Sequence, residues 1–208
     1  MGDVWAIVVA AGSGRRFGGA KQYEPLAGRR VIDWSLAAAR TAADGIVLVV
    51  APDRAGEAEA AADAVVAGAG TRSGSVRAGL AAVPPDAEVV VVHDGARPLA
   101  KGDLFLAVVE AVRAGADAAV PGVPVVDTLR ARAGGTVDRD GLVAVQTPQA
   151  FRAGPLRSAH AAEGEATDDA SLVEAAGGKV VVVNGSPTNL KITRPDDLVV
   201  AEALLRAR

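Results

Sequence analysis

Short apolar runs rich in Val and Ile alternate with alanine-rich stretches along most of the chain. The apolar runs have the length of buried strands and predict strands over residues 4–10, 46–51, 88–93, 116–120 and 179–184. The alanine-rich stretches predict helices over residues 31–43, 55–64, 73–83, 103–114, 154–162, 168–176 and 195–206. This alternation is typical of an α/β fold in which helices cover both faces of a mostly parallel sheet.

The alternation is interrupted between residues 123 and 145, where no helical period is present. Two short extended runs, residues 125–132 and 136–142, flank Gly134 and Gly135, and this pattern predicts a β-hairpin with a tight turn. A two-stranded hairpin is only marginally stable on its own, so this hairpin must pack against another protein surface. We expect residues 1–208 to form a single domain whose arm, residues 123–145, projects from the sheet and packs on a partner subunit. Packing on its own domain is the alternative.

The composition narrows the class of protein. Half of the 208 residues are apolar, 22 are basic and 25 acidic for a net charge of −3, and none is cysteine. The lack of cysteine excludes disulfides, thiolate metal sites and a cysteine nucleophile, and the lack of a basic block argues against a nucleic-acid partner. The apolar runs are too short to span a bilayer and no export signal is recognisable, so we expect a cytoplasmic protein without a membrane partner.

A glycine-rich loop, residues 10–21, follows the first predicted strand and carries Arg15, Arg16 and Lys21. Loops at the carboxyl ends of parallel strands form ligand sites, and cations beside free backbone amides there can bind a polyphosphate. The spacing does not fit the dinucleotide-binding fingerprint, because Gly18 comes one residue late. The loop also lacks the Gly-Lys-Ser/Thr ending of a P-loop. A surface turn with solvated charges is the alternative.

A second polar group ends the predicted strand over residues 88–93. Asp94 follows this strand directly, and a carboxylate at such a strand end can hold a hard cation such as Mg²⁺ that bridges phosphates. Arg97 stands three residues further along and could bind a second phosphate. His93 precedes Asp94, but a histidine at a strand end is more often structural, and we give it no catalytic role.

Six segments, taken in order, resemble one family. The run Ala-Ala-Gly-Ser-Gly-Arg-Arg-Phe at residues 10–17, followed by Lys-Gln-Tyr at residues 21–23, resembles the signature loop of nucleotidyltransferases that act on sugar or polyol phosphates. The Lys-Gln-Tyr ending is similar to that of the 2-C-methyl-D-erythritol 4-phosphate cytidylyltransferases of isoprenoid biosynthesis. The other five segments are residues 70–76, 93–98, 137–142, 147–149 and 189–198. The resemblance implies a Rossmann-like nucleotidyltransferase three-layer sandwich, with a homodimer formed through the projecting arm.

The resemblance also implies a role for individual residues. The implied nucleotide-binding residues are Ala10, Ala11, Gly12, Gly14, Arg16, Lys21, Gly70, Ser75, Gly95 and Lys191. The implied polyol-phosphate ligands are Asp94, Arg97, Thr128, Arg139 and Thr147, with Mg²⁺ at Asp94 and catalytic roles for Arg16, Lys21, Lys191 and Arg139. Two segments depart from the family pattern. Gly95 replaces an Ala, and Ala69-Gly70-Thr71 stands where the family often has Gly-Gly-Asp, which weakens any statement about single contacts to the base.

The implied activity is transfer of CMP from CTP to 2-C-methyl-D-erythritol 4-phosphate. Its phosphate nucleophile is anionic at neutral pH, which agrees with the lack of a recognisable general base. Transfer to D-ribitol 5-phosphate is the alternative, disfavoured by the run at residues 137–142 and by Arg194. A non-catalytic nucleotide-binding regulator is a second alternative, but it would be expected to lack Lys21, Asp94 or Lys191, and all three are present. Because the sequence ends at Arg208, we expect no fused cyclodiphosphate synthase.

Overall fold

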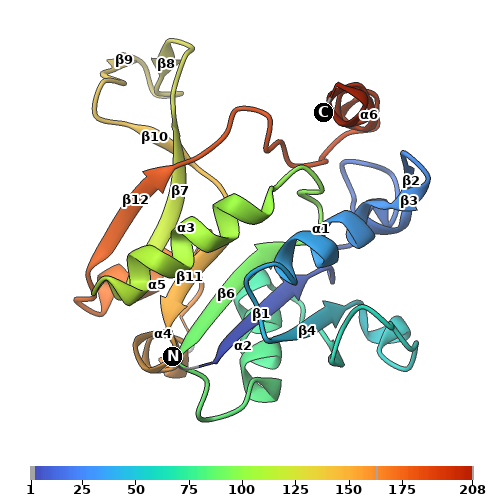
Figure 1. Ribbon diagram of the computed structural model, residues 1–208. Coiled ribbons are helices and arrows are strands. Elements are labelled where there is room, and N and C mark those ends of the chain that lie inside the picture. The colour runs from blue at the N-terminus through green and yellow to red at the C-terminus, as the bar shows by residue number, and fades with distance from the viewer. Residues whose placement is uncertain (1–2, 163, 208) are drawn as a thin grey trace.

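A computed structural model describes residues 3–162 and 164–207 of the chain. Within these residues the core is an eight-stranded sheet of order β10–β7–β11–β6–β1–β4–β5, with β12 also paired to β7 (Figure 1). Its strands are β1 (Val4–Val9), β4 (Gly45–Val50), β5 (Ala64–Ala67), β6 (Val89–Asp94), β7 (Ala118–Pro124), β10 (Val143–Val145), β11 (Gln149–Arg152) and β12 (Val180–Asn184).

Six of these strands run in the same direction. β1 is parallel to β4 and β6, β4 is parallel to β5, and β7 is parallel to β12. β11 is antiparallel to both β6 and β7. It therefore lies between two groups of parallel strands, one formed by β6, β1, β4 and β5 and the other by β7 and β12. β10 is antiparallel to the end of β7. The predicted α/β class with a mostly parallel sheet is confirmed.

The two faces of the sheet are buried by different helices. Successive side chains of a strand point to opposite faces. In β1, Ala6 and Val8 pack with α1 (Val31–Ala39) and α3 (Gly102–Arg113), whereas Ile7 packs with α2 (Arg72–Ala82), α4 (Ala153–Ala161) and α5 (Asp169–Ala175). Both sides of the central strands are buried, which is why these strands read as continuous apolar runs.

The last helix and several short elements complete the fold. α6 (Asp196–Arg206) packs over a smaller cluster that includes Leu26, Leu99 and Ile192. The hairpin β2 (Pro25–Leu26) and β3 (Arg29–Arg30) and the short 3₁₀ turns η1 (Lys21–Tyr23) and η2 (Pro52–Arg54) connect the main elements. No described helix is long and apolar enough to cross a membrane.

One predicted helix is wrong. Residues 55–64 form no helix; the chain there passes from η2 through turns into β5. Alanine favours helix but supplies little apolar area, and short helices depend on packing of an apolar face. The open edge of β4 instead pairs with residues 64–67. β5 and β11 are strands that the sequence pattern did not predict. The other predicted strands and helices are present with ends shifted by a few residues.

The predicted hairpin is present but much shorter than expected. β8 (Leu129–Arg130) and β9 (Thr136–Val137) have two residues each, and Gly134 and Gly135 turn the chain between them with φ of 109° and 85°. Figure 1 shows β8 and β9 standing away from the sheet at the end of β7. The packing of this arm on a partner subunit stays a prediction.

Candidate active site

A cavity of about 650 Å³ lies at the carboxyl ends of β1 and β6. Four segments distant in sequence form its wall: the loop after β1, the loop before α2 with the first turn of that helix, the end of β6, and the connection before α6. The lining residues are Val9, Ala10, Ala11, Gly12, Ser13, Gly14, Arg15, Arg16, Lys21, Gln22, Ala69, Gly70, Thr71, Arg72, Ser75, Asp94, Ala96, Lys191 and Thr193. This is the sheet edge where α/β proteins bind their ligands.

The loop after β1 is fixed by a buried glutamine. Gln22 Nε2 donates to the carbonyl oxygens of Ala10 at 2.5 Å and Gly12 at 3.2 Å, and its side chain is almost fully buried. Gly14 has φ of +63°, and a Cβ there would lie 1.7 Å from the carbonyl oxygen of Gly19. The sequence needs glycine at this turn, because both the dihedral angle and the close approach exclude a side chain. Arg15 and Arg16 are thereby held at the cavity wall.

Asp94 lies at the centre of a cluster of positive charges. Its Oδ2 is 2.7 Å from Lys191 Nζ and 3.7 Å from Arg97 Nε, and its Oδ1 is 3.7 Å from Arg72 Nε. Burial alone raises the pKa of this carboxyl, but Lys191, Arg72 and Arg97 together hold the pKa well below its usual value. Asp94 is therefore a carboxylate at any physiological pH.

The cavity carries an excess of positive charge. Arg15, Arg16, Lys21, Arg72 and Lys191 line it, and Asp94 is the one acidic side chain among the described lining residues. Burial lowers the pKa of Lys21, and repulsion from Lys191 and Arg16 lowers it further. Repulsion among these cations is relieved by a polyanion, which makes the cavity a receptor for a phosphate-rich ligand.

The loop before α2 forms a further part of the cavity wall, next to the glycine-rich loop. Ser75 is buried; its hydroxyl donates to the Thr71 carbonyl at 2.8 Å and accepts from the Ala69 amide at 3.1 Å. A Cβ on Gly68 would lie 2.3 Å from the Cβ of Ala11, so glycine lets this loop approach the loop after β1 closely. The predicted nucleotide-binding residues of the two loops are thus brought together. Within the described structure the Ser75 hydroxyl holds the loop.

Thr147 and Arg97 lie behind the cavity wall and support it. The Thr147 hydroxyl accepts from the Asp94 amide at 3.0 Å and lies 3.1 Å from His93 Nδ1. Arg97 Nη1 donates to the Asn189 carbonyl at 2.7 Å, two residues before Lys191. These contacts join β6, the segment before β11 and the segment before α6. The predicted contact of Thr147 and Arg97 with a polyol phosphate stays a prediction.

Thr128 and Arg139 are not brought to the cavity of their own chain. Both are exposed in the arm, and neither is among the residues that line the cavity. Arg139 Nη1 contacts the carbonyl oxygen of Val126 in the same arm. The structure therefore assembles the predicted nucleotide-binding residues, including Gly95 next to Asp94, but leaves these two predicted site residues apart.

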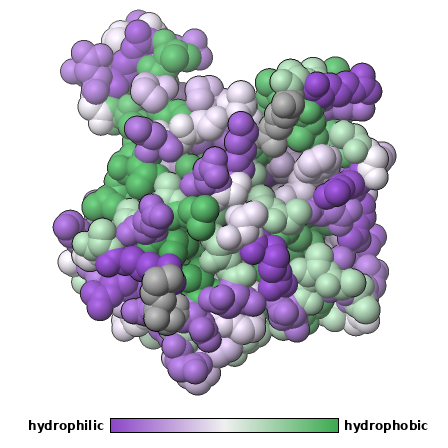
Figure 2. All heavy atoms as spheres, viewed as in Figure 1, coloured by the Kyte–Doolittle hydropathy of each residue, from purple (hydrophilic) through white to green (hydrophobic). Residues whose placement is uncertain are grey.

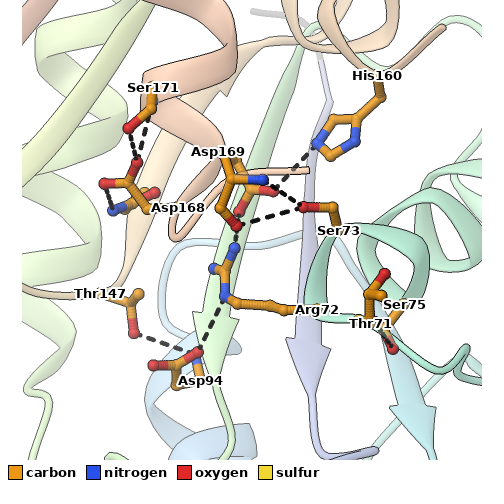
Figure 3. A network of polar contacts seen from close by, with 12 residues as sticks. Thr71, Arg72, Ser73, Ser75, Asp94, Thr147, His160, Asp168, Asp169 and Ser171 are labelled. Atoms are coloured by element: carbon orange, nitrogen blue, oxygen red, sulfur yellow. Dashed lines mark hydrogen bonds and ion pairs between the residues drawn. The ribbon is translucent and has the colours of Figure 1, made fainter. Parts of the chain in front are cut away.

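Sequence reasoning missed three residues next to the cavity. Arg72 Nη1 donates to Asp169 Oδ2 at 2.7 Å, and His160 Nε2 lies 3.0 Å from Asp169 Oδ1 (Figure 3). Arg72 is the first residue of α2, where the helix dipole disfavours a cation. This unfavourable placement is the one signal in the sequence that points to a partner for Arg72.

Comparison with known proteins places the chain in a family. Residues 4–207 match the family model described as IspD, 2-C-methyl-D-erythritol 4-phosphate cytidylyltransferase. The chain belongs to this family. A cytidylyltransferase of that name from Streptomyces coelicolor is 44% identical, over 98% of this chain and 85% of that protein. The crystal structure of the enzyme from Thermus thermophilus superposes with a TM-score of 0.84 at 39% identity, covering 99% of this chain and 100% of that one.

Some relatives are longer. A bifunctional enzyme IspD/IspF from Dinoroseobacter shibae is 47% identical over 99% of this chain, and this chain spans 54% of its length. The chain thus spans about half the length of its bifunctional relatives and most or all of the monofunctional ones. The predicted family and its class, nucleotidyltransferase, are confirmed.

Proposed function

We propose that this chain transfers CMP from CTP to 2-C-methyl-D-erythritol 4-phosphate, releasing pyrophosphate, in non-mevalonate isoprenoid precursor biosynthesis. Membership of the family supports this activity. The observation in the structure that carries the proposal is the cavity at the carboxyl ends of β1 and β6, whose described lining includes five cationic side chains and one carboxylate. Such a wall suits a ligand with three phosphates and a second ligand with one.

In the proposed reaction a phosphate oxygen of the polyol phosphate attacks the α-phosphorus of CTP. A new P–O bond forms there, and the bond from the α-phosphorus to the bridging oxygen breaks, so that pyrophosphate leaves with the electron pair. The attacking oxygen is already anionic, and no general base is required. Arg16 and Lys21 bind the triphosphate and Lys191 binds the α-phosphate, so catalysis consists of alignment and charge neutralisation.

Asp94 is the residue that would hold Mg²⁺, which supplies further charge neutralisation at the phosphate oxygens. Asp94 is the one carboxylate among the described residues that line the cavity. Mg²⁺ commonly binds through one or two carboxylates together with phosphate oxygens and water. Among the described residues the cation nearest to Asp94 Oδ1 is Arg72, with Nε at 3.7 Å, whereas Oδ2 lies 2.7 Å from Lys191 Nζ. The donor set therefore fits Mg²⁺ delivered with the nucleotide.

We also propose a homodimer in which the arm of one chain completes the cavity of the other. Thr128 and Arg139 are exposed and lie away from the cavity of their own chain. The arm and the neighbouring sheet edge expose apolar side chains, namely Val126, Val137, Leu142, Val143, Val145 and Val182. Figure 2 shows apolar surface below the arm along the side that bears β12. A partner chain would bury this surface and receive the arm.

A cytoplasmic location and the lack of a nucleic-acid partner stay predictions.

The test is pyrophosphate release by the purified protein with CTP and Mg²⁺. We expect release with 2-C-methyl-D-erythritol 4-phosphate and little release with D-ribitol 5-phosphate at the same concentration. Release with ribitol phosphate alone would keep the mechanism and overturn the assigned substrate. No release with either, in a protein that binds CTP, would favour a nucleotide-binding regulator.

A further inference from the structure

Arg72 belongs to the wall of the cavity and lies beside Asp94. Its side chain is 24% exposed, and it lines the cavity from the first residue of α2. A guanidinium has five N–H donors. Among the described residues Arg72 makes one hydrogen bond within normal distance, from Nη1 to Asp169. The other donors are left for a ligand.

The partner of Arg72 is fully buried and is itself held on its other oxygen. Asp169 has no exposed surface and lies in the first turn of α5, where the helix dipole stabilises a carboxylate. Its Oδ2 accepts from Arg72 and its Oδ1 faces Nε2 of His160, which is also buried. Neither Asp169 nor His160 lines the cavity. Any effect of this pair on a ligand therefore has to pass through Arg72.

Arg72 lies between two carboxylates and is bound to only one of them. Its Nη1 is 2.7 Å from Asp169 Oδ2, whereas its Nε is 3.7 Å from Asp94 Oδ1, which is too long for a hydrogen bond. Burial by itself lowers the pKa of Arg72, but Asp169 and Asp94 outweigh that effect and raise it. Without the charge on Asp169, Asp94 would be the nearest remaining carboxylate. Asp169 thus holds the guanidinium at the cavity wall, where its Nε stays 3.7 Å from Asp94 Oδ1 (Figure 3).

We infer that Arg72 contacts a phosphate oxygen of a substrate, and that Asp169, supported by His160, is the residue that positions it. The identity of that substrate rests on the proposed function. The phosphate belongs either to the nucleotide or to the polyol phosphate, and the two are separated by experiment. CTP binding measured without an acceptor reports the first, and the KM for the polyol phosphate reports the second.

The experiment compares Arg72→Ala, Asp169→Asn and the double variant with the wild-type protein. We expect each single variant to weaken CTP binding by calorimetry, or to raise the KM for the polyol phosphate, by about tenfold to a hundredfold, the usual size of a charge-assisted hydrogen bond. The double variant should be no worse than Arg72→Ala, because Asp169 acts through Arg72. Arg40→Ala is the matched control: it breaks an ion pair with Asp63, neither residue lines the cavity, and it should leave both constants unchanged.

Two outcomes would overturn the inference. One is an Arg72→Ala protein with an unaltered dissociation constant for CTP and an unaltered KM. The other is a further loss from Asp169→Asn in the Arg72→Ala background, in a protein that thermal unfolding shows to be folded. If Asp169→Asn does not fold, His160→Gln replaces it and should weaken the same constant only when Arg72 is present. A wild-type protein that binds CTP but releases no pyrophosphate would contradict the proposed function. The effect of each variant on CTP binding could still be measured by calorimetry, so the inference about Arg72 would still be tested.

Discussion

The cavity and the arm differ in how their site residues are held. At the cavity, buried side chains such as Gln22, Thr147 and Asp169 hold the loops and charges that face the ligand. In the arm, Thr128 and Arg139 are exposed, and β8 and β9 pair over two residues each. One chain therefore preorganises the cavity by itself, whereas the arm needs a further surface to fix Thr128 and Arg139. A second copy of the chain is the surface that we propose.

The largest expected effect concerns the preorganised side. Lys21→Ala should lower kcat by about a hundredfold or more, because it removes a fixed cation from the triphosphate site. Lys101→Ala, on the exposed start of α3 outside the cavity, is the matched control and should leave the rate unchanged. Steady-state pyrophosphate release measures both. A Lys21→Ala enzyme with the wild-type rate would remove this residue from the catalytic set.

The shape of the glycine-rich loop should matter next. Gly14→Ala places a Cβ 1.7 Å from a backbone oxygen at a φ of +63°, so the loop must move. We expect kcat/KM for CTP to fall by about tenfold or more, since strain of this kind costs about 1–2 kcal/mol before the clash is counted. Gly19→Ala in the same loop has nothing within 4 Å of its added Cβ and serves as control. Equal kinetics for the two variants would mean that this turn is not needed for nucleotide binding.

The arm should affect only the second substrate. Arg139→Ala is expected to raise the KM for the polyol phosphate by about tenfold, through loss of one charge-assisted hydrogen bond, and to leave CTP binding unchanged. Arg132→Ala, an exposed arginine of the same arm, is the control. The measurements are KM and calorimetric CTP binding. Weaker CTP binding by Arg139→Ala would contradict the proposal that the arm contacts the polyol phosphate and not the nucleotide.

The last predicted effect lies beneath the cavity and concerns stability, not binding or turnover. Burial lowers the pKa of His93 from 6.5 to about 4. Between these values the unfolded chain binds more protons than the folded one, so the free energy of unfolding falls as pH drops through this window. The loss from His93 between pH 7 and pH 5 should be about 2 kcal/mol. Urea unfolding at the two pH values should show a smaller loss for His93→Gln. An equal loss would assign the acid sensitivity to other groups.

The sequence predicted the fold where local pattern and packing agree. The central strands are buried on both faces, and their apolar runs are visible without knowledge of their neighbours. Residues 55–64 failed because alanine content indicated helix while the nearest available partner was the edge of β4. β11 was missed because it is short and is stabilised by pairing with β6 and β7, which no local pattern reveals.

For the site, too, residues in recognisable local segments were predicted, whereas contacts between distant segments were not. Arg16, Lys21, Asp94 and Lys191 stand in segments whose spacing resembles a known family, and all four line the cavity. Asp169 stands at the start of the predicted helix over residues 168–176, but its pairing with Arg72 was not predicted, because the two residues are 97 positions apart in the sequence. Contacts between residues this far apart in the sequence depend on how α2 and α5 pack relative to each other over the sheet. This packing cannot be predicted from either segment alone.

The path of the chain from the arm to the cavity determines where this protein tolerates insertions and deletions. β10 ends at Val145 and β11 begins at Gln149, and both are held in register by β7. One residue added between them would either have to fit into a connection of three residues or shift the register of β11 and turn its side chains to the opposite face of the sheet, and either change would displace Thr147 from Asp94. The turn between β8 and β9 has no such fixed points. We therefore expect natural relatives to vary in length at the tip of the hairpin and to keep the three-residue connection before β11.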